Sequence, residues 1–553
     1  MKLKLKFIGS ETTKITRKDP VRLEQLAEEY SDRMKYRPLL AKVSGIETSL
    51  AETVEEDCTI KFVDATTQSG QLVYQHTLTM VFLKAVKNVL GNVPVVIQNP
   101  LNKGIFITIE NGEELQESTV NIIAGLMSEY IRRDMPIEEK YLPRKEAIET
   151  LREFGYEDKA RLVEQAKDVK KVSFHYLGDY VNSFYGVLAP STGYVDKFEL
   201  MKYKEGLILR FPYTDDPDVL PEYRDDVNLY EAFSKEQEWI KLLGVKCLPD
   251  LNDVIRSRKT RDLILLAEAL HEKRIAEIAD MITESGKRII LIAGPSSSGK
   301  TSFAKRLCIQ LRVNGVNPLY MGTDDYFVER EDTPIGEDGK PDFENLDAMD
   351  VELFNRNMND LLSGKEVDMP TFNFLTGKKE YGKRITKLEP NMVMVIEGIH
   401  ALNKAMSVHI ADDDKFKIYI SPLLQLKADR HNRISTTDAR MLRRLVRDNK
   451  HRGHNAETTI ESWPKVRAGE DKNIFPYNGE ADVVFNSATI YELAILKRYA
   501  QPLLEEVPRE SSAYGEARRM IQFLKYFDSL RGERYIPNNS IVREFIGGSI
   551  LLE

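Results

Sequence analysis

The sequence predicts an α/β fold with a mainly parallel, doubly wound sheet, preceded by a small β-rich domain and an α+β domain. Strand-like and helix-like segments alternate from residue 288 onward. A glycine-rich loop follows the first of these strands, and short strands surround a single helix near the amino terminus. Alternating strands and helices build a parallel sheet with helices on both of its faces.

Length and composition limit the class of protein. The chain has 553 residues, too many for one core at about 150 residues per domain. The 42% of hydrophobic residues are ordinary for a globular protein, and no apolar run approaches the length needed to cross a bilayer. The amino terminus has no signal-peptide pattern, so we expect a cytoplasmic protein without a membrane partner. The three cysteines lie far apart and predict neither disulfides nor a zinc site.

The amino-terminal half predicts two modules. Residues 1–65 read as a small β-rich domain, with strands at 2–8, 40–43 and 59–63 and a helix at 22–32. Residues 66–225 read as an α+β domain, with a helix opening near His76, extended segments at 95–98 and 104–110, and helices at 120–133, 144–153 and 159–166. An acidic, proline-rich stretch at 211–221 suggests a surface connection near its end.

A helical connector is expected at 226–285. Its apolar stripe consists of Leu263, Leu266, Leu270, Ile278 and Ile282, which should pack on the next domain. Residues 286–500 then form the main α/β domain, with strands at 288–293, 318–323, 392–396, 415–420 and 481–485 and helices at 301–314 and 351–363. Residues 501–553 are expected to form a carboxyl-terminal helical segment.

A phosphate-binding loop (P-loop) follows the first strand of that domain. Gly294-Pro295-Ser296-Ser297-Ser298-Gly299-Lys300-Thr301 matches the whole pattern, and Ser302 continues into a helix. Glycines let backbone N–H groups close around phosphate oxygens, Lys300 reaches the terminal phosphates, and the Thr301 hydroxyl can bind Mg²⁺. The alternative is a Ser/Gly loop that merely joins a strand to a helix, which the flanking elements disfavour.

Two carboxylates are placed to act on such a ligand. Asp324 follows the second strand and Glu397 ends the third, so both should emerge at the carboxyl edge of the sheet, where such folds bind ligands. A kinase needs a carboxylate beside the attacking hydroxyl, a role for Asp324, and a carboxylate for Mg²⁺, a role for Glu397. An acidic turn and a plain strand end are the structural alternatives.

Cations gather between Arg440 and His454. Arg440, Arg443, Arg444 and Arg447 lie three or four residues apart, on adjoining faces of a helix. Such a segment can close over phosphates and neutralise charge on the transferring group. A solvated charged face and an RNA-binding patch are the alternatives.

From residue 288 to 495 the order of these motifs resembles the uridine kinase branch of the phosphoribulokinase/uridine kinase family. The resemblance implies an ATP- and Mg²⁺-dependent kinase in which Asp324 is catalytic and Arg444, Arg447 and Arg452 match lid arginines. Asp342-Phe-Glu-Asn-Leu-Asp-Ala348 resembles the ribose-binding segment and places Glu344 at the ribose hydroxyls. Pro370-Thr-Phe-Asn-Phe374 resembles the base pocket, so Phe372 should line it.

Two positions depart from that family. Gly377 stands where a histidine reads the pyrimidine base, and His454 stands where the last lid arginine would be. Base selectivity is therefore open, while phosphoryl transfer is expected to remain.

The amino-terminal half resembles threonyl-tRNA synthetase. Residues 1–65 resemble its ubiquitin-like β-grasp (TGS) domain, and residues 66–225 resemble the domain that carries editing. Of the four polar positions of the editing motifs only His76 is present: the first motif reads His76-Thr-Leu-Thr-Met80, and the second aligns to Phe184-Tyr-Gly-Val-Leu188. We expect a binding or regulatory module without hydrolytic chemistry, in which His76 is a structural histidine.

The sequence therefore predicts a kinase that phosphorylates the 5′-hydroxyl of a ribonucleoside, with uridine and cytidine as the first candidates. A kinase for a purine nucleoside or a sugar phosphate is one alternative. An RNA-associated regulator driven by ATP, with the amino-terminal half contacting RNA, is another. The net charge of −8 argues against a protein that binds nucleic acid over its whole surface by electrostatic attraction. The sequence does not decide whether the protein forms a homo-oligomer.

Overall fold

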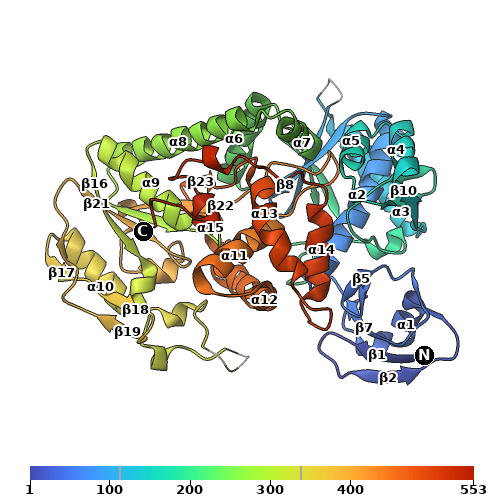
Figure 1. Ribbon diagram of the computed structural model, residues 1–553, viewed down its shortest axis with the longest axis horizontal. Helices are drawn as coiled ribbons and strands as arrows, with labels where there is room; N and C mark the ends of the chain where they lie inside the picture. The colour runs from blue at the N-terminus through green and yellow to red at the C-terminus, as the bar shows by residue number, and fades with distance from the viewer. Residues whose placement is uncertain (111–113, 337–338, 340, 553) are drawn as a thin grey trace.

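The computed structural model describes residues 1–110, 114–336, 339 and 341–552. Figure 1 shows a small amino-terminal lobe, a second lobe above it and a larger part built on the carboxyl-terminal half, with a long helix running along the top. The predicted α/β fold class is confirmed: two smaller domains precede a part built on a parallel sheet, which we call the kinase part after the resemblance noted above.

The first lobe is a β-grasp domain. Its five-stranded sheet has the order β2-β1-β7-β4-β5, and helix α1 supplies buried Leu23 and Leu26 to its core. The elements are β1 (Lys2–Lys6), β2 (Thr13–Thr16), β3 (Val21–Arg22), α1 (Leu23–Glu29), β4 (Leu40–Val43), β5 (Ile46–Thr48), β6 (Thr53–Val54) and β7 (Cys58–Val63).

The second lobe is an α+β domain around the long helix α2. This helix begins at Gln68, eight residues before the expected start at His76, because the Thr67 hydroxyl caps it by accepting the Gly70 N–H. Several strands of this lobe were not predicted, namely β10 to β14. The elements are α2 (Gln68–Leu90), β8 (Val95–Leu101), β9 (Gly104–Ile109), α3 (Glu117–Arg132), β10 (Glu138–Pro143), α4 (Arg144–Glu153), α5 (Glu157–Gln165), β11 (Lys171–Leu177), β12 (Tyr180–Asn182), β13 (Glu199–Tyr203) and β14 (Gly206–Arg210).

Three helices connect this lobe to the kinase part: α6 (Val227–Leu243), α7 (Leu248–Arg256) and α8 (Thr260–Ser285). Leu263, Ile278 and Ile282 of α8 are buried as expected. The expectation for Leu266 was wrong, because its side chain is 44% exposed and Ile264 and Ile275 lie inward instead.

A five-stranded parallel sheet of order β16-β21-β15-β22-β23 forms the centre of the kinase part. Along β15, Ile290 and Ile292 pack toward α8 and α9, while Ile289 and Leu291 pack toward α10. Both faces are thus covered, which explains why the strand is apolar throughout. The elements are β15 (Ile289–Ala293), α9 (Lys300–Val313), β16 (Asn317–Gly322), α10 (Val351–Leu362), β17 (Glu366–Asp368), β18 (Thr371–Asn373), β19 (Lys378–Glu380), β20 (Ile385–Lys387), β21 (Met392–Glu397), β22 (Lys415–Ser421), α11 (Thr436–Arg452), α12 (Ala456–Asn473), β23 (Val483–Asn486) and α13 (Glu492–Glu505).

The last fifty residues are less helical than expected. After α13 the helices are α14 (Tyr514–Leu524) and the short α15 (Arg543–Ile546), and much of the remainder consists of turns. The end of the chain returns to the kinase sheet, where Figure 1 marks it beside α9.

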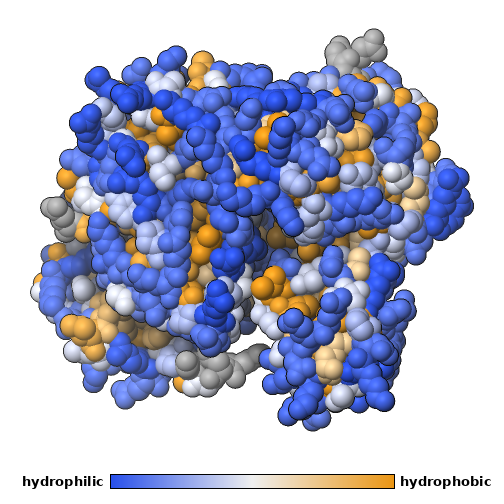
Figure 2. Space-filling view, turned by 45° about the vertical axis from the view of Figure 1, so that its right-hand side comes forward, coloured by the Kyte–Doolittle hydropathy of each residue, from blue (hydrophilic) through white to orange (hydrophobic). Residues whose placement is uncertain are grey.

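The surface shown in Figure 2 is mainly hydrophilic, with apolar residues in small separate areas. None of the helices in the described part of the chain combines the length and apolar character that a membrane crossing requires.

Candidate active site

The P-loop joins β15 to α9 in a tight conformation that only certain residues allow. A Cβ on Gly294 would lie 2.1 Å from the carbonyl oxygen of Ile420, so no side chain fits there. Gly299 has φ +84°, in the left-handed region that favours glycine. The first turn of α9 thus begins at Lys300 with its N–H groups directed along the helix axis toward the loop.

The side chain of Lys300 folds back onto the P-loop. Its ammonium group donates to the carbonyl oxygens of Gly294 at 2.9 Å and Pro295 at 3.3 Å. The Ser296 N–H donates to Glu470 at 2.9 Å. These donors are the ones the P-loop pattern assigns to phosphate oxygens.

Two arginines of the basic segment hold the loop and are not available as lid cations. Arg440 is buried, pairs with Glu470 and donates to the Ser296 carbonyl at 3.0 Å. Arg443 is also buried, pairs with Glu492 at 2.7 Å and donates to the Ser297 carbonyl at 3.3 Å. The expectation that the whole segment closes over phosphates was therefore wrong for these two, because buried guanidinium groups need carboxylate partners.

The three arginines matched to the lid share one carboxylate. Asp448, 1% exposed, is paired with Arg444 at 3.2 Å, Arg447 at 2.9 Å and Arg452 at 3.5 Å. Arg444 also donates to the Ser296 hydroxyl at 2.8 Å, which places it at the P-loop. One buried aspartate thereby gathers three positive charges on one side of the loop.

Asp324 and Glu397 lie together at the carboxyl edge of the sheet, as predicted. The Asp324 side chain is open to solvent. Partial loss of hydration and the nearby Glu397 carboxylate raise the pKa of Asp324 to about 6, and the positive charge of Lys300 opposes this rise. The Thr301 hydroxyl donates to Glu397 at 2.9 Å, and Tyr320 donates to the same oxygen at 3.2 Å. The P-loop and both carboxylates therefore form one charged site.

Glu344 lies next to this site. It packs against α12, where a Cβ on Gly469 would lie 2.7 Å from the Glu344 Cβ. Loss of hydration and the nearby Glu470 raise the pKa of Glu344, while Arg444 and Lys300 oppose that rise. The structure thus brings Glu344 within electrostatic reach of the phosphate-binding lysine.

Phe372 belongs to a cluster of aromatic rings. Its ring is buried and lies 5.7 Å from Phe327 and 5.1 Å from Phe374, and the Phe343 ring lies 5.6 Å from Phe327. Phe343 and Phe374 are the more exposed rings, so they offer more surface to a ligand than Phe372 does. The backbone N–H of Phe372 donates to Asp325, the neighbour of Asp324, at 3.3 Å.

The structure shows the surroundings of Gly377 and His454, the two positions that depart from the family pattern. Gly377 has φ +72°, and a Cβ there would lie 2.6 Å from the Arg330 Cβ, so a histidine does not fit without rearrangement. His454 is exposed just after α11, and its backbone N–H donates to the Asp448 carbonyl at 3.1 Å.

His76 lies on α2 with its ring 5.7 Å from that of Phe184. Burial lowers the pKa of His76 to about 4 and that of the nearby His175 to about 3, so both are neutral at pH 7. Within the described residues, neither ring nitrogen of His175 has a hydrogen-bond partner, and no three His, Cys, Asp or Glu side chains gather as metal ligands do.

A buried polar junction links this lobe to the basic helix α11. Lys159 on α5 lies 3.6 Å from Asp429, which precedes α11, and both side chains are almost fully buried. Lys159 also donates to Asn182 at 2.5 Å and to the Ser183 carbonyl at 2.6 Å. The N–H of Ile97 on β8 donates to the Arg430 carbonyl at 2.8 Å. The segment leading into α11 is thus held by the amino-terminal half.

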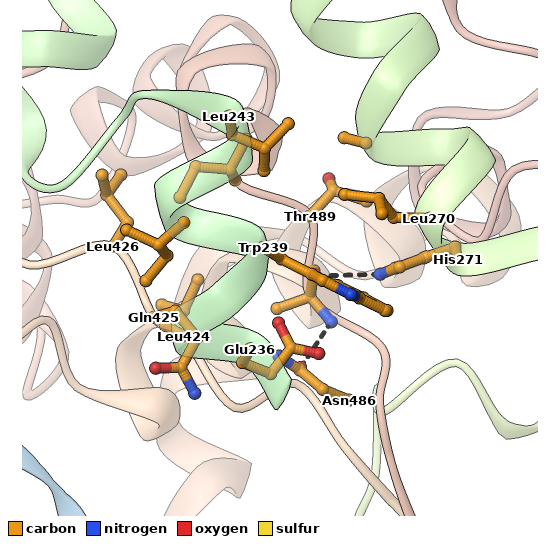
Figure 3. A pocket seen from close by; sticks show the side chains of 14 residues that line it. Glu236, Trp239, Leu243, Leu270, His271, Leu424, Gln425, Leu426, Asn486 and Thr489 are labelled. Carbon is orange, nitrogen blue, oxygen red and sulfur yellow. Dashed lines mark hydrogen bonds between the residues drawn. The ribbon is translucent and has the colours of Figure 1, made fainter. Parts of the chain in front are cut away.

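A small cavity lies apart from the P-loop, between α6, α8 and the segments that follow β22 and β23 (Figure 3). Trp239 and Glu236 line it on one side, and Asn486 lies beside Glu236. Its volume of about 30 Å³ holds about one or two water molecules. Loss of hydration raises the pKa of Glu236 to about 8.

Sequence reasoning missed several contributors to the site: Tyr320, Asp448, Glu470 and Glu492. Asp448 had a readable signal, since it stands four residues from both Arg444 and Arg452 on one helix. The two glutamates had no such signal, because Glu470 contacts the loop and Glu492 contacts Arg443 from helices that are distant in the sequence.

Comparison with known proteins agrees with this geometry. A family model described as "Phosphoribulokinase / Uridine kinase family" matches residues 289–494. A uridine kinase of Macrococcus caseolyticus (strain JCSC5402) is 31% identical over 208 residues, covering 37% of this chain and 91% of that protein. A uridine kinase of Chloroflexus aurantiacus (strain ATCC 29366 / DSM 635 / J-10-fl) is 30% identical over 199 residues, covering 36% of this chain and 85% of that protein.

The amino-terminal region has a different relative. It is similar to a threonine–tRNA ligase of Natranaerobius thermophilus (strain ATCC BAA-1301 / DSM 18059 / JW/NM-WN-LF), 28% identical over 168 residues, or 30% of this chain and 26% of that ligase. The chain thus spans about a quarter of the ligase. With the P-loop, its carboxylates and the match over residues 289–494, the chain belongs to the phosphoribulokinase/uridine kinase family.

Proposed function

We propose that the protein is an ATP-dependent ribonucleoside kinase that transfers the γ-phosphate to the 5′-hydroxyl, with uridine and cytidine as first acceptors. The observation that carries this is the position of Asp324, a carboxylate open to solvent within electrostatic reach of Lys300. An ATPase that only switches conformation needs no such carboxylate facing an acceptor.

The reaction follows from that arrangement. The acceptor oxygen bonds to the γ-phosphorus, the bond from that phosphorus to the β–γ bridging oxygen breaks, and ADP leaves. The hydroxyl proton passes to the Asp324 carboxylate and then to water. Lys300 and the arginines gathered by Asp448 hold charge on the transferring group, so catalysis is mostly positioning and electrostatic stabilisation.

Mg²⁺ would be held by Thr301 and Glu397. Their oxygens are already in contact, and a site with few protein ligands suits a cation that keeps several waters and binds substrate phosphates. When bound it would neutralise charge on the β- and γ-phosphates.

The acceptor would contact Glu344 through its ribose hydroxyls and the aromatic cluster through its base. The carboxylate of Glu344 can bridge two vicinal hydroxyls, and the exposed rings of Phe343 and Phe374 can stack on a planar base. Glycine at 377 removes one base-reading side chain, which favours a purine nucleoside or another small alcohol as the second candidate acceptor.

A panel of acceptors tests the proposal. The full-length protein is incubated with Mg²⁺, γ-labelled ATP and, in turn, pyrimidine ribonucleosides, purine ribonucleosides, 2′-deoxyribonucleosides and sugar phosphates. Labelled uridine or cytidine monophosphate supports the proposal, and weaker labelling of the 2′-deoxy analogues supports the role of Glu344. ATP hydrolysis stimulated by tRNA, with no labelled acceptor, would replace the kinase with an RNA-associated regulator.

A further inference from the structure

The carboxyl-terminal segment 540–551 lies against the start of the P-loop helix (Figure 1). Ile541 is so close that a Cβ on Gly299 would meet its side chain at 2.5 Å. The Phe545 ring lies 4.8 Å from the Arg443 guanidinium, and the Lys450 ammonium donates to the Ile546 carbonyl at 2.6 Å. The segment therefore contacts both the P-loop and the basic helix α11.

Glu544 makes the contact that bears on nucleotide binding. One oxygen of its carboxylate accepts the Ser302 hydroxyl at 2.7 Å and the Ser302 N–H at 3.3 Å. Ser302 is the third residue of α9, and first-turn N–H groups have no partner within their own helix. In a P-loop these groups bind the α- and β-phosphates. The Glu544 carboxylate thus occupies the Ser302 N–H, a donor that a bound triphosphate would need.

The charge of Glu544 is not cancelled by a neighbour. Within the described residues its side chain forms no ion pair, and its hydrogen bonds go to Ser302. The other carboxylate on the loop, Glu470, differs because Arg440 and Arg467 pair with it. An unpaired carboxylate at the amino-terminal end of a helix is favoured there by the helix dipole, as a phosphate would be.

We propose that segment 540–551 is an autoinhibitory strap, in which Glu544 competes with the phosphates of a nucleoside triphosphate for the end of α9. Binding of the nucleotide then requires Glu544 to leave Ser302. The inference rests on the proposed function only in that both place a triphosphate on the P-loop.

The first test measures nucleotide affinity without an acceptor. Titration calorimetry of the full-length chain with Mg²⁺ and the non-hydrolysable β,γ-imido analogue of ATP gives the Kd of the wild type and of Glu544→Gln. We expect Glu544→Gln to lower the Kd about tenfold, the size of one charge-assisted hydrogen bond. Glu506→Gln is the control, because it changes an exposed glutamate at the end of α13, outside the strap; its Kd should equal that of the wild type. An equal or higher Kd for Glu544→Gln overturns the proposal.

The second test needs no variant. Hydrogen exchange of the wild-type amides in 541–551 is compared with and without the saturating ATP analogue. Faster exchange with nucleotide shows that the strap leaves, whereas equal or slower exchange shows that it stays docked and overturns the proposal. If neither wild type nor Glu544→Gln binds the analogue, the strap and the proposed kinase both fail; if both bind it equally, the strap alone fails.

Discussion

The hydroxyl of Thr301 donates a hydrogen bond of 2.9 Å to Oε1 of Glu397. The first residue brings an oxygen from the P-loop helix and the second brings one from the end of β21, so two distant segments present a pair of oxygens at one point. Tyr320 also donates to Glu397 and fixes the orientation of its carboxylate.

Glu397→Gln should raise the Mg²⁺ concentration that half-saturates the kinase reaction by about tenfold or more, because a carboxylate ligand becomes a neutral amide. The measurement is initial rate against Mg²⁺ at fixed ATP. Glu389→Gln, which changes an exposed glutamate just before the same strand, should leave the curve unchanged. Equal curves for both variants would remove Glu397 from the metal site.

Asp324→Asn should lower kcat about 10²-fold, the usual contribution of a general base. In the wild type, kcat/KM should fall tenfold per pH unit below about 6, because protonation of Asp324, with its pKa raised to about 6, removes the base. Asp325→Asn should keep this acid limb, since Asp325 pairs with Arg384 instead. A pH–rate profile of the three proteins checks this, and an acid limb that persists in Asp324→Asn would contradict it.

Asp448→Asn should lower kcat/KM for ATP about tenfold, because Arg444, Arg447 and Arg452 lose the charge that gathers them. Steady-state kinetics at varied ATP gives the value. Asp360→Asn, in an exposed pair with Lys365, serves as the control and should behave as wild type. Wild-type kinetics for Asp448→Asn would mean that the arginines are placed by something else.

Asp429→Asn should destabilise the whole chain by about 3–5 kcal/mol, because it leaves the buried Lys159 without its counter-charge. Urea unfolding followed by fluorescence measures the loss. Glu480→Gln breaks the exposed pair with Lys404 and should cost at most about 1 kcal/mol. Similar losses in the two variants would show that the junction is not the stabilising contact.

Glu236→Gln should stabilise the protein at pH 8 and not at pH 5. Loss of hydration raises the pKa of Glu236 to about 8, so folding favours its protonated form. The contribution of protonated Glu236 to the free energy of unfolding is complete at pH values below the pKa that Glu236 has in the unfolded chain. This contribution is lost as the pH rises through about 8. We expect a thermal midpoint about 2–4 °C higher than wild type at pH 8. A gain of the same size at pH 5 would point to packing instead of ionisation.

Local signals in the sequence predicted the kinase part well. The P-loop, the strands around it and the carboxylates at their ends are each set by a short run of residues, and β15 and β21 begin and end within a residue of the expected positions. Side-chain alternation and motif spacing suffice for such features because neighbours along the chain determine them.

Features that depend on distant contacts were not predictable. Whether an arginine of α11 lies free or buried depends on Glu470 and Glu492, which belong to other helices. Strands β12 and β14 are buried along their whole length, so they show no alternation of apolar and polar residues that would predict them. The carboxyl-terminal segment likewise gave no sign that it would meet the P-loop.

The salt bridge between Lys159 and Asp429 also limits how the chain can be divided. The amino-terminal half contributes Lys159 and the carboxyl-terminal half contributes Asp429, and both ions are buried. Either half produced by itself would therefore expose its ion to solvent, together with the apolar residues around it. Lys159 and Asp429 therefore tie the position of the segment that leads into α11 to that of α5 in the ligase-like half.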